Sequence, residues 1–326
     1  MKRRLLALSL AMVGAFFAGC EDTSTNTPVT FIPAPPSNPM ALSLSDTSVR
    51  LKWTPSPSES NTAFKGYLIK ATSGSRTFVT DTIPAGQTIV DLLGLDANKI
   101  YTFTIVACTK DTVSSSISIE WAGAKRFRGI RAYETASTNG SGIRLSDGAN
   151  LTIANGTQWD VCLDTRTDGG QDNWAFGSPQ ASTYTDTLGY FIRGAQAGQK
   201  AKDTWVFCDS TSQGPVPYFV VADSLEAVFE SRALGTGKMQ NVQIMLENLQ
   251  NQNRSVVFYV KTAEGNFAKI LLKAVGGSVL QGAAPNRYVE IDYSFQTAVN
   301  VPYALRQGIA PVDNPRIVKI GTRSQR

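Results

Sequence analysis

The sequence contains no histidine among its 326 residues. Without an imidazole, the chain cannot perform Ser-His-Asp or Cys-His catalysis, and it lacks the commonest protein ligand of zinc and haem. This absence favours a protein that binds over one that catalyses, and we expect no enzymatic activity.

Net charge is also small once the first residues are set aside. The formal net charge is +5, and Lys2, Arg3 and Arg4 carry three of these charges, so the remainder of the chain has +2. A nearly neutral protein presents no electrostatic surface for nucleic acid. We therefore expect no nucleic-acid partner.

Long apolar runs are absent, and the longest, Leu5 to Phe17, is too short to span a bilayer comfortably. It follows the basic residues 2–4 and ends in Phe17-Ala18-Gly19-Cys20. Small residues before a cysteine resemble a bacterial lipobox, which implies cleavage before Cys20 and acylation of its thiol. We expect residues 1–19 to be a lipoprotein signal peptide and Cys20 to anchor an outer membrane lipoprotein in the bacterial envelope. The alternative is an ordinary signal peptide in which Cys20 is incidental.

Three further cysteines follow, Cys108, Cys162 and Cys208. Cys162 and Cys208 each lie on an expected strand, and adjacent strands could bring them together. A bridge between them would close a loop of about 45 residues and contribute roughly 4 kcal/mol if unstrained. We predict a Cys162–Cys208 disulfide in the oxidising envelope, with Cys108 as the odd thiol.

Residues 20–36 are rich in Thr, Ser and Pro and poor in large apolar side chains. Such a segment cannot form a core, so we expect a lipid-anchored tether.

Short alternating segments separated by turns fill residues 37–124. In SVRLKW, for example, Val49, Leu51 and Trp53 share one face, and the segment 100–108 alternates in the same way. Strands of this length, broken by turns about every ten residues, predict an antiparallel sandwich.

This segment resembles a fibronectin type III domain. The residues that carry the resemblance are Pro36, Pro39, Trp53, Tyr67, Leu95 and Tyr101. The stretch from Leu95 to Tyr101 is similar to a tyrosine corner, in which the phenol returns to the backbone and closes the turn. The resemblance implies a spacer or interaction module without catalytic residues, in which Trp53, Tyr67 and Tyr101 are core aromatics.

Residues 125–303 are again mostly strand-like. A hairpin is expected over residues 255–275, and a half-buried edge strand or meander over residues 288–295. One helix is expected at residues 223–234, because Asp223 and Glu226 form a capping box before an apolar stripe.

Four aspartates recur at four-residue intervals around the stretch WDVCLDTRTDGG, at positions 160, 164, 168 and 172. The pattern indicates a strand followed by a turn at residues 168–170. On a strand, Asp160 and Asp164 lie roughly 13 Å apart, too far for the carboxylate pair of a glycosidase. Asp168, Asp172 and Asn173 remain an alternative set of calcium ligands.

A Trp159-Asp160 strand that runs into a Gly-Gly turn resembles the opening motif of the HmuY-like lipoprotein family, with Asp168 in place of the usual Asn. Thr262-Ala263-Glu264-Gly265, followed by Ala268-Lys269, is similar to the closing strands of that family. The resemblance implies a larger, mostly antiparallel β domain with one or two short helices, in which this stretch is chiefly a fold signature with Trp159 in the core. It also implies a surface lipoprotein that captures haem or a related porphyrin through two axial side chains.

Without histidine, Met239 and Met245 are the candidate haem ligands, because a thioether can bind haem iron. On a continuous strand they lie about 20 Å apart, and on a helix they face different directions. The alternative is that both are ordinary core or surface methionines. Two functions therefore stay open: haem or porphyrin capture, and a structural or adhesive surface protein that binds a protein or glycan.

Residues 304–326 form a basic tail. Its basic residues are Arg306, Arg316, Lys319, Arg323 and Arg326. We expect a solvated, partly disordered end.

Overall fold

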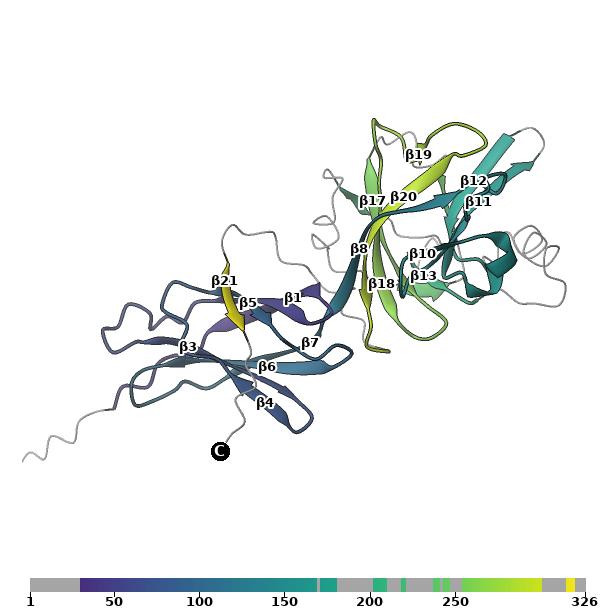
Figure 1. Cartoon of the computed structure of the whole chain (residues 1–326). Helices are drawn as coiled ribbons and strands as arrows, with labels where there is room; N and C mark the ends of the chain where they lie inside the picture. The colour runs from purple at the N-terminus through teal and green to yellow at the C-terminus, as the bar shows by residue number, and fades with distance from the viewer. Residues whose placement is uncertain are drawn as a thin grey trace, which may run out of the picture. The chain divides into compact units, whose positions relative to one another are not determined.

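The computed structural model describes residues 30–168, 171–180, 202–209, 218–220, 237–240, 243–246, 254–300 and 315–319. These residues form two β sandwiches with separate hydrophobic cores (Figure 1). The predicted all-β class is confirmed. The expected signal peptide, the lipidated Cys20, residues 20–29 of the tether and the helix at 223–234 lie outside the described residues.

The part of the chain that the structure describes contains no helix long and apolar enough to cross a membrane.

The first sandwich packs two four-stranded sheets face to face. One sheet has the order β1 (Ser37–Ser45), β2 (Ser48–Thr54), β5 (Ile89–Leu93) and β21 (Arg316–Lys319). The other has the order β4 (Arg76–Val79), β3 (Gly66–Ser73), β6 (Ile100–Cys108) and β7 (Ile117–Ala122). The strands predicted at 48–53 and 100–108 correspond to β2 and β6.

The three predicted core aromatics of this sandwich are buried: Trp53, Tyr67 and Tyr101 are each at most 1 % exposed. The Tyr101 hydroxyl accepts a hydrogen bond from the backbone N–H of Asp96 at 2.9 Å. This bond returns the phenol to the backbone just before the strand that carries it, so the tyrosine corner is confirmed. Burial raises the pKa of Tyr101, which keeps the phenol neutral.

The second sandwich has a smaller and a larger sheet. The smaller has the order β10 (Ala149–Leu151), β9 (Gly142–Arg144), β11 (Val161–Asp168), β12 (Gln171–Gly177) and β16 (Gln243–Met245). The larger has the order β15 (Gly237–Gln240), β13 (Trp205–Asp209), β17 (Ser255–Lys261), β18 (Phe267–Leu272), β20 (Tyr288–Gln296) and β19 (Leu280–Gln281). In addition, β8 (Ala124–Tyr133) pairs with β20, and β14 (Tyr218–Val220) pairs with β17. A short 3-10 segment, η1 (Ile153–Gln158), precedes β11.

The core of this sandwich combines the inner faces of both sheets. Leu163 and Phe176 come from the smaller sheet, and Phe258, Ile270 and Ile291 come from the larger one; all are at most 1 % exposed. The ring centres of Phe176 and Phe258 lie 6.0 Å apart in an edge-to-face arrangement, which joins the two sheets.

Two expectations about strand placement need correction. The strand β20 is not an edge, because it pairs with β18 on one side and with β8 on the other. The antiparallel succession β17, β18, β20 does form the expected meander. Part of the basic tail is also ordered, since β21 pairs in parallel with β5 of the first sandwich. Neither partnership is visible in local sequence, because each joins segments far apart in the chain.

Candidate functional site

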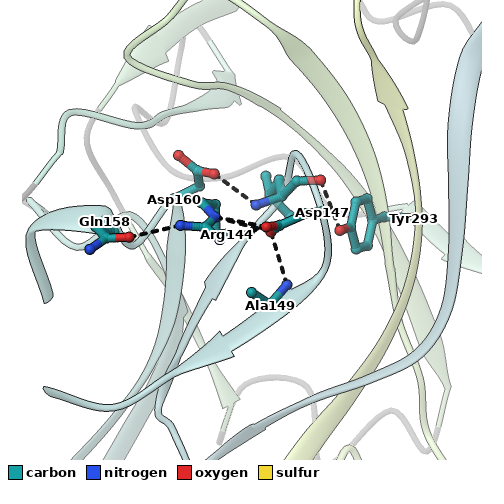
Figure 2. A network of polar contacts seen from close by, with 7 residues as sticks. Arg144, Asp147, Ala149, Gln158, Asp160 and Tyr293 are labelled. Carbon is teal, nitrogen blue, oxygen red and sulfur yellow. Dashed lines mark hydrogen bonds and ion pairs between the residues drawn. The ribbon is translucent and has the colours of Figure 1, made fainter. Parts of the chain in front are cut away.

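The Trp159-Asp160 motif is built into the second sandwich. Trp159 is 1 % exposed, which confirms that it lies in the core. A Cβ on Gly142 would lie 2.1 Å from its ring, so the glycine allows the indole to pack directly on the backbone of β9. Next to the ring, Asp160 Oδ2 accepts the backbone N–H of Leu145 at 2.7 Å, and the Tyr293 hydroxyl donates to the Leu145 carbonyl at 2.9 Å (Figure 2).

The same network continues to the surface at the turn between β9 and β10. Arg144 donates to Asp147 and, through Nη1, to Gln158 Oε1 at 2.7 Å (Figure 2). Asp147 also accepts the N–H of Ala149 at 3.1 Å. Hydrogen bonding to Arg144 lowers the pKa of Asp147, so this carboxylate stays ionised. The network therefore closes a turn, and the aspartates at its two ends have structural partners.

Lys202 joins the two motifs that resemble the HmuY-like family. Its Nζ lies 3.4 Å from Asp160 Oδ1 and 2.6 Å from Glu264 Oε1. Burial raises the pKa of Asp160, and the opposing effect of Lys202 does not cancel it. Burial acts in the same sense on Glu264, but the hydrogen bonds from Lys202, the backbone and Thr262, together with the charge of Lys202, outweigh it and lower the pKa of that carboxyl. Sequence reasoning missed Lys202, because no local pattern marks a lysine that bridges segments about 100 residues apart.

The predicted Cys162–Cys208 disulfide is not formed, because Cys162 is a free, fully buried thiol. The prediction required adjacent strands, but Cys162 lies on β11 of the smaller sheet and Cys208 on β13 of the larger one. Burial raises the pKa of Cys162 well above its usual value, and the nearby Asp164 carboxylate adds to the shift. Such a thiol is a poor nucleophile. Cys108 is also a buried free thiol.

The two candidate haem ligands lie on different sheets. Met239 is on β15, the outermost strand of the larger sheet, opposite Phe207. Met245 is on β16, the outermost strand of the smaller sheet, opposite Ala175. The chain thus passes from one sheet to the other between Gln240 and Gln243. The two methionines therefore do not lie on one continuous strand or helix.

The candidate calcium ligands lie on the hairpin of β11 and β12. Asp168 pairs with Gln171, Asp172 with Thr167, and Asn173 with Arg166. Within the described ranges, no group of three His, Cys, Asp or Glu residues is placed to hold a metal ion.

A different cluster lies on the outer face of the larger sheet, and we call it the Arg131 face. It consists of Arg131 and Tyr133 on β8, Tyr288 and Glu290 on β20, and Lys273 just after β18. Arg131 pairs across the strands with Glu290, and Tyr133 pairs with Tyr288, so these four residues share one side. The alternate residues Ala132 and Val289 point into the core. The alternation of residues 288–295 was visible in the sequence, but the partner strand β8 was not.

The Arg131 guanidinium is held from several directions. Its carbon lies 4.4 Å from the centre of the Tyr288 ring, and its Nε donates to Glu290 Oε2 at 3.0 Å. Lys273 Nζ binds the other oxygen of Glu290 at 2.7 Å. The rings of Tyr133 and Tyr288 lie 5.4 Å apart and are inclined by 48°. The Arg131 side chain nevertheless remains 45 % exposed, so an ordered cation and two half-buried rings face solvent.

Comparison with known proteins identifies the first sandwich. Residues 34–124 match the family model "Fibronectin type III domain". The FN5 domain of Drosophila Lar is 22 % identical over 28 % of this chain and 98 % of that chain, with a TM-score of 0.22. The fn3 domain of the human collagen alpha-1(XX) chain is 20 % identical over 30 % of this chain and 92 % of that chain, with a TM-score of 0.25. A search of curated proteins finds no match. Residues 34–124 therefore form a fibronectin type III domain.

Proposed function

We propose that this chain is a non-enzymatic, envelope-anchored surface lipoprotein whose second sandwich binds a glycan at the Arg131 face. The observation that carries the proposal is the ordered Arg131 guanidinium, stacked on Tyr288 beside Tyr133 and still half exposed. Aromatic rings offer apolar surface to a sugar ring, and fixed charged groups beside them can hydrogen-bond its hydroxyls.

The charge balance of this face favours a glycan over other ligands. The cations Arg131 and Lys273 are matched by the carboxylates of Glu290 and Asp292. A nucleic-acid surface needs excess positive charge, which a balanced cluster does not provide. Sugar hydroxyls both donate and accept, so a surface that carries donors and acceptors together suits them.

The rest of the chain supports a role in display. Fibronectin type III domains are typically binding or structural modules, and the lipid anchor and tether expected before residue 37 would hold the two sandwiches at the cell surface. Haem capture, which the HmuY-like resemblance implies, receives no support from Met239 and Met245 on separate sheets.

Affinity electrophoresis in gels that contain soluble polysaccharides, such as dextran, xylan and alginate, tests the proposal. We expect at least one polysaccharide to retard the protein, and Arg131→Ala and Tyr288→Ala to weaken that binding about tenfold or more. Arg76→Ala is a matched control, because Arg76 is also half exposed, lies 5.2 Å from the Phe78 ring centre and pairs with an acid, Asp96. Absence of retardation in every gel, or an equal loss in the Arg76 variant, would overturn the proposal.

A further inference from the structure

The fibronectin type III domain carries a strand that does not belong to the module itself. Residues 34–124 match the family model, yet the sheet β1-β2-β5 is extended by β21 from residues 316–319. Strand β5 pairs with β2 on one side and with β21 on the other, with Ile317 opposite Asp91 and Lys319 opposite Leu93. The edge of β5 is therefore a strand-accepting edge, and the occupant seen on it is the C-terminal segment of the same chain.

The contacts that hold β21 are few. Val318 is partly buried against the core of the domain, whereas Ile317 is 62 % exposed. Arg316 Nη1 donates to Gln87 Oε1 at 3.1 Å. One core-facing side chain and a four-residue parallel ladder stabilise the pairing only weakly, because each such hydrogen bond replaces a hydrogen bond to water and gains little.

We propose that β21 of one molecule also pairs with the β5 edge of a second copy. The β5 edge, with the core surface that Val318 contacts, is then an interaction surface between copies of this chain. The contacts are the same within and between molecules, so only the effective concentration separates the two arrangements. Fifteen residue steps separate Asn300 from Pro315, just before β21, a contour length of about 50 Å, which sets the largest separation that exchange could bridge. Exchange becomes competitive where copies are crowded, at concentrations on the order of millimolar.

The test distinguishes pairing within one molecule from pairing between two molecules. It uses the full chain with Cys20 and Cys208 replaced by Ser and with one new cysteine in each of two copies. One copy carries Leu93→Cys and the other Lys319→Cys, at positions that are cross-strand partners. Neither copy can form the new bridge within itself, and neighbouring strands are close enough for a disulfide. We expect the mixed disulfide dimer to form when the two copies are combined at about millimolar concentration.

Two further variants show whether that dimer depends on the contact between Val318 and the core of the domain. Val318→Ser, placed on the Leu93→Cys copy, should raise the dimer yield about fivefold, because it weakens the copy's own β21, which must leave the β5 edge before the strand of the other copy can pair there. Ile317→Ser is the matched control on the exposed side of the same strand and should leave the yield unchanged. If the mixed copies give no dimer while a chain with both cysteines closes its own bridge, exchange does not occur. A dimer that is insensitive to Val318→Ser is a random collision product and equally overturns the proposal.

Discussion

At the scale of a single residue, Gly142 leaves no room for a larger side chain beside Trp159. A Cβ at position 142 would lie 2.1 Å from the indole, and the fully buried ring has little room to move. We expect Gly142→Ala to destabilise the protein by about 1–3 kcal/mol through overpacking. Chemical denaturation followed by tryptophan fluorescence and circular dichroism measures this loss.

The same substitution in a Trp159→Leu background is the control. Leucine is smaller than the indole, so Gly142→Ala should cost less there, and the difference between the two costs measures the contact. Equal costs in both backgrounds would show that the clash is not with Trp159.

Single residues also show what a sequence can and cannot reveal. The burial of Trp53 and Tyr101 was predictable, because large aromatics at alternating strand positions have few other places to go. Lys202 was not predictable, since its role depends on two acids that only the folded chain brings within reach.

At the scale of elements, Glu290 ties three strands of the larger sheet together. Glu290 lies on β20 and accepts hydrogen bonds from Arg131 on β8 and from Lys273, just after β18. Burial alone would raise the pKa of Glu290, but the hydrogen bonds from Lys273 and Arg131 outweigh it and lower the pKa.

This lowered pKa makes the contribution of Glu290 to stability dependent on pH. A carboxyl whose pKa is lower in the folded state stabilises the fold above its unfolded value, near 4.5, and loses that contribution as the pH falls through the folded value. Glu290→Gln should therefore cost about 1–2 kcal/mol at pH 7, and the cost should shrink below pH 4. Thermal unfolding of both proteins across this range measures the difference.

The control for that comparison is Glu120→Gln at an exposed position of β7, which removes one negative charge without touching this cluster. If the cost of Glu290→Gln stays constant from pH 7 to pH 3, the pairing of the carboxylate does not contribute.

Strands with strong alternation were predictable as elements, whereas their partners were not. The segments 48–53 and 100–108 emerge from periodicity because a half-buried strand repeats every two residues. Pairing between β8 and β20, or between β5 and β21, has no local signal. The prediction of a Cys162–Cys208 disulfide was wrong for the same reason. Two cysteines on correctly predicted strands need not lie on the same sheet.

At the scale of the whole molecule, haem capture is the function that competes with the proposed glycan binding. A haemin titration followed by absorbance shows whether the protein binds haem, as the HmuY-like resemblance implies, although it contains no histidine. Because Met239 and Met245 lie on different sheets, we expect no saturable red-shifted Soret band. A saturable band that is lost in Met239→Ala or Met245→Ala would instead establish haem capture.

The position of β21 in the chain also affects the order in which the protein is completed. Gln87 and Arg316, which meet beside β5, are 229 residues apart. During synthesis, the fibronectin type III domain emerges long before the strand that covers its edge. For that interval the nascent chain presents an unpaired β5 to any extended polypeptide nearby, so the domain is most exposed to wrong strand partners before its own C-terminal segment arrives.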